Sequence, residues 1–474
     1  MPNKTKIVAT IGPASNSKAI LEKLVEAGMC VARLNFSHGS YQEHVEVIRT
    51  IRSIARVMNR PVGILLDLQG PKIRTGKLQD GQPVRLKRSS IVKLTTREVL
   101  GTSELISTTY KNLVQDVKRG AKILLDDGLI ELKVLSKTAD TVKCKVVNGG
   151  KLKENKGINL PGVKVSAPSL TTKDERDLDF GIKNKVDYFA LSFVRQADDI
   201  KQAKARIARQ GANIPVIAKI EKPEAVANLN EILEVADGIM VARGDLGVEL
   251  NPEQVPTIQK HIIQAAIQAN RPVITATQML ETMSTNPIPT RAEASDVANA
   301  IFDGTDAVML SGETATGKYP LKAVQMMSKI AAQAESSPFM KYNLKNLVAT
   351  PNPIAQAVAQ SAVNIVHEVH ASSIVAFSVS GGTHKLISRQ RPIKPVYGFT
   401  SDLDVYNRMA LIWGITPMYI AKINDAQRLV NASENLLLDK KLARKDDLIV
   451  LVIGLGLKEG STNLIKIHRV GHED

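Results

Sequence analysis

The fold of this chain is constrained most by an alternation of short apolar runs, rich in β-branched residues, with segments of helical periodicity. The runs occupy residues 6–9, 29–34, 62–68, 188–193, 215–220, 239–242, 273–277 and 307–310. Buried strands that alternate with helices are typical of βα units around a parallel sheet. Eight such units are the number that closes a (β/α)8 barrel, and we therefore expect an α/β chain built on a TIM barrel.

Two further stretches do not follow this alternation. Between residues 72 and 168 apolar residues recur with period two, and Asp127-Gly128 is a hairpin turn signal, so we expect an inserted small β-barrel domain. Beyond a linker that begins near residue 336, the pattern predicts a smaller, open α/β domain. The expected domains are a catalytic barrel of residues 1–71 and 169–338, an inserted lid of residues 72–168, and a C-terminal domain of residues 345–474.

Composition narrows the classes of partner. The formal net charge is +16, but no long basic run is present, so the charge is dispersed and suits small polyanionic substrates. Aromatic residues make up only 4% of the chain, which argues against the stacking platforms of single-stranded nucleic-acid binders. The two cysteines give no disulfide framework, and no segment reaches transmembrane length. We expect a cytoplasmic protein that binds neither nucleic acid nor a membrane.

Three charged residues follow two of the apolar runs. Lys219 and Glu221 end the run at 215–220, and Asp245 follows the run at 239–242. Side chains two apart on a strand share a face, and parallel barrel strands bring their carboxyl ends to one edge. Two carboxylates there suit Mg²⁺, and a lysine beside the metal can neutralise charge on a transferring phosphoryl group. The alternative is a set of solvated charges at strand ends.

Seven loops at the ends of the runs carry motifs that a barrel does not need for folding. They comprise residues 10–15, 33–39, 67–75, 219–221, 243–247, 277–280 and 310–314. Their sequences are TIGPAS, RLNFSHG, DLQGPKIRT, KIE, RGDLG, TQML and LSGET. In order and spacing, together with the inserted and C-terminal domains, these loops closely resemble the pyruvate kinase family over the whole chain.

The resemblance implies a reaction and an assembly. It implies transfer of the phosphoryl group of phosphoenolpyruvate to ADP, giving ATP and pyruvate, by a homotetramer with a regulatory C-terminal domain. It also implies a divalent cation, Mg²⁺ or Mn²⁺, held by Glu221 and Asp245. By position, Lys219 stabilises the transferring phosphoryl group and Arg33 reaches the phosphate. The residues that would hold the substrate carboxylate are Gly244, Asp245 and Thr277.

The resemblance also places the nucleotide. Its phosphates would lie near Asn35, His38, Arg74 and Lys173. After transfer an enolate must be protonated on carbon, and no side chain in the motifs is an obvious acid for that step. We expect a water held by hydroxyls such as those of Thr277 and Ser311 to donate the proton, so replacing Thr277 should slow ketonisation more than phosphoryl transfer.

One departure from the family pattern concerns potassium. Members that require K⁺ hold it with residues that match Asn35, Ser37, Asp67 and the carbonyl of Leu68. Those members carry a glutamate at the position of Lys72 in this chain. Because a fixed ammonium can do the electrostatic work of a monovalent cation, and would repel one, we expect activity to persist without K⁺. The alternative is a surface lysine beside an intact K⁺ site.

A second departure concerns regulation. A loop between a strand and a helix matches the family's effector phosphate loop, and its candidate ligands are Ser378, Ser380, Gly381, Gly382 and Thr383. Hydroxyls and backbone N–H groups at a helix N-terminus suit a phosphate. The final loop, 454–460, lacks the tryptophan and arginine that many fructose-bisphosphate-responsive members use. A sugar monophosphate or AMP is the expected effector, and a bare turn without ligand is the alternative.

Two other classes of function remain to be separated from this one. A Mg²⁺-dependent barrel lyase or aldolase acting on pyruvate or phosphoenolpyruvate would also place carboxylates at strand ends, but would not consume ADP. A basic nucleic-acid-binding protein would be retained by DNA or RNA in a salt-sensitive manner, which we do not expect here.

Overall fold

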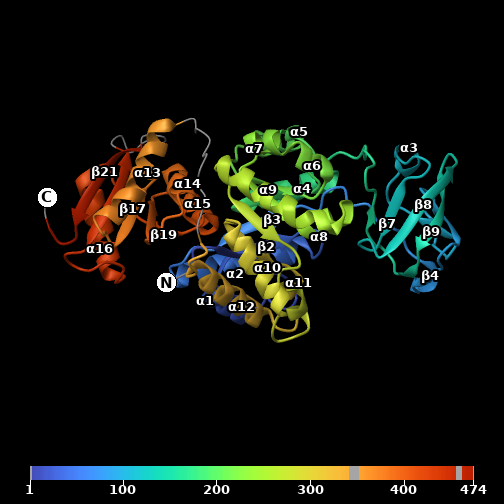
Figure 1. Ribbon diagram of the computed structural model, residues 1–474, viewed down its shortest axis with the longest axis horizontal. Helices are drawn as coiled ribbons and strands as arrows, with labels where there is room; N and C mark the ends of the chain where they lie inside the picture. Colours follow the sequence, from blue (N-terminus) through green and yellow to red (C-terminus); the bar gives the residue numbers. More distant parts are fainter. Residues whose placement is uncertain (1–2, 341–351, 455–461, 473–474) are drawn as a thin grey trace.

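The structure is a computed structural model of the chain and describes residues 3–340, 352–454 and 462–472. Three parts lie in a row along its longest axis, with the barrel between the inserted β domain and the C-terminal domain (Figure 1). No helix in these described ranges is long and apolar enough to span a membrane.

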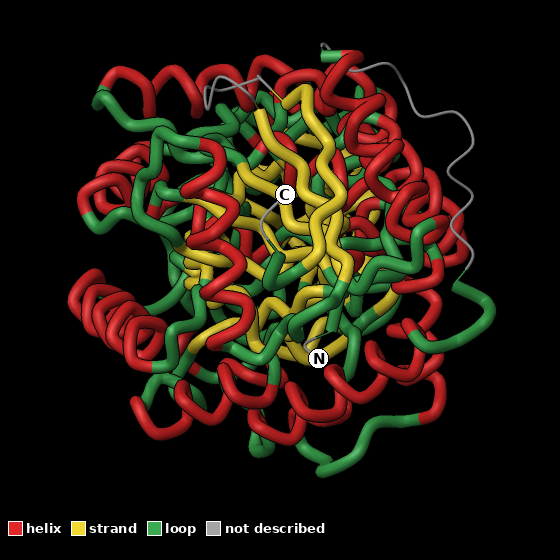
Figure 2. The backbone as a smooth tube through the Cα atoms, turned by 90° about the vertical axis from the view of Figure 1, so that its left-hand side faces the viewer, coloured by secondary structure: helices red, strands yellow, loops and turns green. Residues whose placement is uncertain are grey.

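Eight parallel strands close the central barrel in the order β1-β16-β15-β14-β13-β12-β3-β2. They are β1 (Lys6–Ile11), β2 (Met29–Asn35), β3 (Gly63–Asp67), β12 (Tyr188–Leu191), β13 (Val216–Ile220), β14 (Gly238–Ala242), β15 (Val273–Ala276) and β16 (Ala307–Leu310). Each coincides with one of the eight apolar runs, so the TIM barrel is confirmed. Seen from the side of the C-terminal domain, helices form a ring around the strands (Figure 2).

The helices around the barrel follow the strands in sequence. They are α1 (Lys18–Ala27), α2 (Tyr41–Val57), α4 (Thr172–Lys183), α5 (Ala197–Arg209), α6 (Pro223–Ala227), α7 (Leu229–Val235), α8 (Arg243–Glu249), α9 (Val255–Gln268), α10 (Arg291–Phe302), α11 (Gly312–Ala315) and α12 (Pro320–Glu335), with the 3-10 turns η2 (Pro252–Gln254) and η3 (Glu281–Ser284). Local chemistry sets the helix ends. Ser40 and Glu43 cap α2 reciprocally, and Gly28, at φ 119°, ends α1 in a left-handed conformation.

The N-terminal mouth of the barrel is closed by the C-terminal domain. Leu411, which is 1% exposed, packs with Val8, Val31 and Leu65 in the cluster that fills the barrel interior. Beside it, Lys6 Nζ donates a hydrogen bond to the carbonyl of Ile415 at 2.8 Å. Because this end is covered, the loops at the carboxyl ends of the strands remain as the place for a site.

The inserted segment is all-β except for one short helix and one turn. Its elements are η1 (Gln79–Gly81), β4 (Val84–Leu86), β5 (Ile91–Thr95), β6 (Leu105–Ser107), α3 (Leu113–Asp116), β7 (Lys122–Leu125), β8 (Ile130–Lys137), β9 (Thr141–Asn148), β10 (Gly150–Leu152) and β11 (Ile158–Asn159). A six-stranded sheet runs β11-β7-β8-β9-β5-β6, and β10 pairs with β4. Arg74 bridges to Gly157 beside β11, and Thr75 bridges to Thr108 beside β6. These bridges link residues 74 and 75 to both edges of the sheet, and the segment is an inserted β domain, as expected.

The C-terminal domain is an open sheet in the order β19-β18-β17-β20-β21, parallel except for β21. Its elements are α13 (Pro353–Glu368), β17 (Ser373–Phe377), α14 (Gly382–Arg389), β18 (Val396–Thr400), α15 (Leu403–Arg408), η4 (Met409–Leu411), β19 (Ile415–Tyr419), α16 (Ala426–Asp439), β20 (Leu448–Gly454) and β21 (Thr462–Arg469). The edge strand β19 was not predicted, because Pro417 breaks the strand pattern; an edge tolerates proline. Most of the linker predicted from residue 336 onwards lies outside the described residues.

Candidate active site

The carboxyl ends of three barrel strands bring Arg33, Asp67 and Lys219 together. Arg33 and Asp67 belong to the paired strands β2 and β3, and Lys219 belongs to β13. Arg33 Nε lies 2.7 Å from Asp67 Oδ2, and Lys219 Nζ lies 3.2 Å from Asp67 Oδ1. Burial by itself raises the pKa of Asp67, but the charges of Lys219 and Arg33 outweigh burial and hold that pKa below its ordinary value. Asp67 is therefore an anion that fixes both cations.

Lys219 has two further partners, Glu221 and Ser192. Its ammonium lies 2.8 Å from Glu221 Oε1 and donates a hydrogen bond to Ser192 Oγ at 2.7 Å. Burial alone lowers the pKa of Lys219, but the charges of Asp67 and Glu221 raise it above its ordinary value. Lys219 is thus a permanent cation held by three neighbours. Ser192, the residue after β12, was not predicted, because nothing in its sequence context marks its contact with Lys219.

Glu221 and Asp245 are the residues that would hold a divalent cation. Glu221 is 1% exposed; its Oε2 accepts a hydrogen bond from Phe193 N at 3.0 Å, and its Oε1 faces the Lys219 ammonium at 2.8 Å. Burial raises the pKa of Glu221; Lys219 opposes this shift, and Asp245, in the first turn of α8, adds to it. Mg²⁺ takes one or two protein carboxylates and keeps water and substrate oxygens as its other ligands, so this pair fits it.

The two groups expected to hold the substrate carboxylate are hydrogen-bonded to each other. Gly244 N donates to Thr277 Oγ1 at 2.7 Å, and that hydroxyl donates to the carbonyl of Ala276 at 2.6 Å. Thr277 has φ 69°, in the left-handed region that a β-branched residue rarely adopts. Backbone strain of this kind is concentrated at functional sites, and here it aims the hydroxyl at the first turn of α8.

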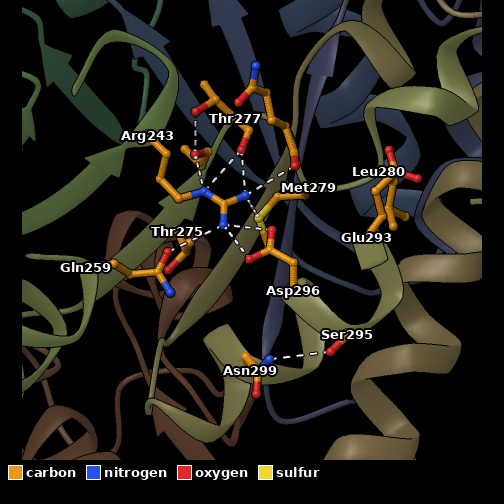
Figure 3. A network of polar contacts seen from close by, with 12 residues as sticks. Arg243, Gln259, Thr275, Thr277, Met279, Leu280, Glu293, Ser295, Asp296 and Asn299 are labelled. Carbon is orange, nitrogen blue, oxygen red and sulfur yellow. Dashed lines mark hydrogen bonds and ion pairs between the residues drawn. The ribbon is translucent and has the colours of Figure 1, made fainter. Parts of the chain in front are cut away.

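Arg243 connects these groups, although no role was predicted for it from the sequence. Its guanidinium forms an ion pair with Asp296 at 2.7 Å and donates to the carbonyl of Thr277 at 2.7 Å (Figure 3). Arg243 lies in the RGDLG motif beside Gly244 and Asp245, and this position was the only indication of a role in the sequence. The carbonyls that it contacts and Asp296 lie 33 or more residues away, and one sequence does not reveal such contacts.

The residues expected near the nucleotide come from two domains, the barrel and the inserted domain. On the barrel, Lys173 Nζ donates to the carbonyl of Phe36 at 2.7 Å and pairs with Asp177 at 2.6 Å. From the inserted domain, Arg74 Nη1 donates to the carbonyl of Asn155 at 3.0 Å.

His38 shows that the two domains share one electrostatic environment. Burial lowers the pKa of His38, and the charges of Arg74, Lys72 and Arg33 lower it further. These cations surround the loop that also carries Asn35. The arrangement suits a polyanion bound between the barrel and the inserted domain.

Comparison with known proteins decides the family. The profile described as pyruvate kinase, barrel domain, matches residues 2–324, and the profile described as pyruvate kinase, alpha/beta domain, matches residues 356–468. The chain belongs to the pyruvate kinase family. Relatives named pyruvate kinase from Staphylococcus aureus strains MRSA252 and USA300 are each 48% identical to it, over 99% of this chain and 81% of their own length. The crystal structure of a pyruvate kinase from Cryptosporidium parvum is 39% identical, covers 99% of this chain and 96% of its own, and has a TM-score of 0.92.

Membership of the pyruvate kinase family confirms three predictions: the family itself, the barrel fold with its C-terminal α/β domain, and a phosphotransferase enzyme. The lyase or aldolase alternative is not favoured. Membership of the family also implies a divalent metal ion as cofactor.

Three of the groups expected around a monovalent cation, those of Asp67, Leu68 and Asn35, are already engaged by protein partners. Asp67 holds Arg33 and Lys219, as described above. The carbonyl of Leu68 accepts a hydrogen bond from Ser192 Oγ at 2.7 Å, and Asn35 Oδ1 accepts one from Ser37 N at 3.1 Å. The Leu68 carbonyl and the Asn35 amide oxygen could each still accept a second contact, since such an oxygen has two lone pairs.

The loop expected to bind an effector phosphate lies on a cavity of about 1040 Å³ between the C-terminal domain and the barrel. Ser378, Ser380, Gly382 and Thr383 line the cavity on one side, and barrel residues such as Asn270 line the other. The hydroxyl of Ser378 accepts a hydrogen bond from Gly381 N at 3.0 Å, and that of Thr383 lies 2.6 Å from Thr462 Oγ1. Val379, Ser380 and Gly382 are the exposed residues of the loop. Of the final loop at 454–460, only Gly454 lies within the described residues.

Proposed function

We propose that this chain transfers the phosphoryl group of phosphoenolpyruvate to ADP, giving ATP and pyruvate. The single observation that carries the proposal is the buried cation Lys219, fixed at the strand ends by the carboxylates of Asp67 and Glu221. Phosphoryl transfer needs positioning and neutralisation of charge more than covalent chemistry, and this cluster supplies both.

Each residue of the cluster has a role in this scheme. Lys219 lies beside the transferring phosphoryl group, and Arg33 binds the phosphate from the neighbouring strand. Glu221 and Asp245 hold Mg²⁺ or Mn²⁺, which supplies charge neutralisation and a template for the substrate oxygens when bound. Gly244, Asp245 and Thr277 hold the carboxylate, so the Gly244 N–H exchanges its bond to Thr277 for one to the substrate.

Other residues would bind the nucleotide and supply the proton for the enolate. Asn35, His38, Arg74 and Lys173 accept the ADP phosphates between barrel and inserted domain. A water near Thr277 and Ser311 protonates the enolate; Ser311 Oγ is buried and has no hydrogen-bond partner among the described residues.

The test of this proposal is ATP formation from phosphoenolpyruvate and ADP with Mg²⁺. We expect ATP and pyruvate in equal amounts, and no consumption of phosphoenolpyruvate when ADP is omitted. Consumption that does not depend on ADP would indicate the lyase or aldolase instead.

We further propose that activity does not require K⁺. Asp67, one of the expected ligands, already carries two cationic partners, and Lys72 adds positive charge to the neighbouring His38 loop. In buffer free of K⁺ and NH₄⁺, the wild-type protein should keep its turnover. Lys72→Glu reverses a charge there and should lose about tenfold or more without K⁺, and regain it when K⁺ is added. Lys77→Glu, at an exposed position, is the matched control. A wild-type protein that is inactive without K⁺ would refute the proposal.

The cavity beside the Ser378–Thr383 loop is proposed as the site of a sugar monophosphate or AMP. The phosphate would bind at the N-terminus of α14, and the remainder of the ligand would face the barrel. A Cβ at Gly382 meets Ser380 Oγ at 3.7 Å, so a side chain fits there. We expect AMP or a hexose monophosphate to lower the KM for phosphoenolpyruvate. Gly382→Asp should abolish that response by repulsion, and the neutral Gly382→Asn should keep part of it. If neither ligand changes KM or the melting temperature, the loop is a bare turn.

The assembly and setting follow from the family alone. We propose a homotetramer of cytoplasmic chains, each with the catalytic barrel, lid and regulatory domain at the boundaries predicted from the sequence. Sedimentation analysis measures the oligomeric state directly.

A further inference from the structure

The side chain of Arg243 forms an ion pair and also contacts the backbone that is proposed to bind the substrate. It is the first residue of α8, and its side chain is 10% exposed. Nη2 donates to the carbonyl of Thr277 at 2.7 Å and to that of Gln278 at 3.3 Å. Nε lies 3.3 Å from the carbonyl of Ala276. One guanidinium therefore contacts three successive carbonyls, from the last residue of β15 onwards.

Those carbonyls belong to a strained segment. Thr277 and Gln278 have φ 69° and 54°, two consecutive left-handed residues of which neither is glycine. Such a conformation is unfavourable for residues with a side chain and persists only where neighbouring contacts compensate. The fork of donors on Arg243 is the contact that the structure offers, because it binds the carbonyls in the orientation that this conformation gives them (Figure 3).

The guanidinium is itself held from two other helices. Nη1 lies 2.8 and 2.7 Å from the two oxygens of Asp296 on α10, and 3.4 Å from Gln259 Oε1 on α9. The position of Arg243 is thus set by the scaffold around the barrel.

The same residue precedes Gly244 in the chain, so it links the two elements that face the substrate. The α8 end carries Gly244 N and Asp245, and the β15 end carries Thr277 Oγ1, which lies 2.7 Å from Gly244 N. A shift of either element would separate the carboxylate-binding groups from the metal ligand.

We propose that Arg243 is a positioning residue for phosphoenolpyruvate: it holds Thr277 in its left-handed conformation and fixes the β15 loop to the first turn of α8, without touching the substrate. The inference rests on the proposed function. Arg243 would thus contribute to specificity for the carboxylate-bearing substrate although it is not among the residues proposed to contact that substrate.

The test compares Arg243→Lys with Arg52→Lys. Arg52 is a matched control at the opposite end of the barrel, because its guanidinium also binds two carbonyls, those of Val62 and Lys185, and one aspartate, Asp187. A lysine cannot reproduce such a fork. We expect Arg243→Lys to raise the KM for phosphoenolpyruvate and lower kcat, with kcat/KM falling by about 10²-fold, while the KM for ADP stays unchanged. Arg52→Lys should lower the melting temperature but should not raise the KM for phosphoenolpyruvate relative to the KM for ADP.

A second variant keeps the test decisive if Arg243→Lys does not fold. Asp296→Asn retains an acceptor for Nη1 but loses the charge, so it should shift the KM for phosphoenolpyruvate in the same direction by about threefold to tenfold. Equal changes in both KM values, or kinetics like those of Arg52→Lys, would overturn the inference. An inactive wild-type protein would instead contradict the proposed function, so the two failures are distinguishable.

Discussion

Replacing Lys219 by methionine should lower the rate of ATP formation by about 10³-fold or more. The ammonium lies between two buried carboxylates, whose charges raise the pKa of Lys219 and so favour its charged form. Methionine fills a similar volume but supplies no charge to the phosphoryl group. Steady-state ATP formation with saturating Mg²⁺ measures the loss.

A structural effect of this substitution must be separated from the chemical one. Removal of Lys219 leaves Asp67 paired with Arg33 alone and Glu221 without a cation, so the melting temperature should also fall. Lys204→Met is the control: Lys204 Nζ forms an ion pair with Asp237 at 2.8 Å away from the site, and its loss should leave kcat unchanged. Folded Lys219→Met protein with near-wild-type turnover would contradict the role of this lysine.

Glu221→Gln should abolish most of the response to divalent metal, with turnover lower by about 10²-fold or more. The amide keeps the shape of the side chain and an oxygen for the Phe193 N–H, but it removes the anionic charge that the metal requires. Binding of Mn²⁺, followed by electron paramagnetic resonance in the presence of phosphoenolpyruvate, measures the loss without relying on activity.

The pH dependence of Mn²⁺ binding gives a second readout of Glu221. Burial and Asp245 raise the pKa of Glu221, so protons compete with the metal as pH falls, and Mn²⁺ binding to the wild-type protein should weaken on the acid side. Glu221→Gln should lose the part of this dependence that comes from Glu221. Glu224→Gln, on α6, should bind Mn²⁺ as the wild type does, and unchanged Mn²⁺ affinity in Glu221→Gln would show that Glu221 is not a ligand.

The barrel could be predicted because its signals are local. Each strand is a short apolar run, and helix ends are marked by residues such as Ser40, Glu43 and Gly28. Features that depend on distant segments could not be predicted. The bridges of Arg74 and Thr75 to the edges of the inserted sheet, and the insertion of Leu411 into the barrel mouth, leave no periodic pattern in the chain.

The same distinction holds within the site. Lys219 and Glu221 were predicted to share a face because they are two apart on one strand, and they lie 2.8 Å apart. Ser192 and Asp296 could not be predicted, because each acts through a residue distant in sequence. Ser192 contacts Lys219, and Asp296 contacts Arg243. The left-handed conformation of Thr277 is also invisible in sequence, since threonine is a poor residue for it.

The most direct test of the central claim is a single turnover with the enzyme in excess over phosphoenolpyruvate that carries a radiolabelled phosphoryl group, in the presence of Mg²⁺ and ADP. We expect the label to appear in the terminal phosphate of ATP as phosphoenolpyruvate disappears, and Lys219→Met to leave phosphoenolpyruvate intact on that timescale. Release of the label as inorganic phosphate, or its transfer at the same rate by Lys219→Met, would contradict the account.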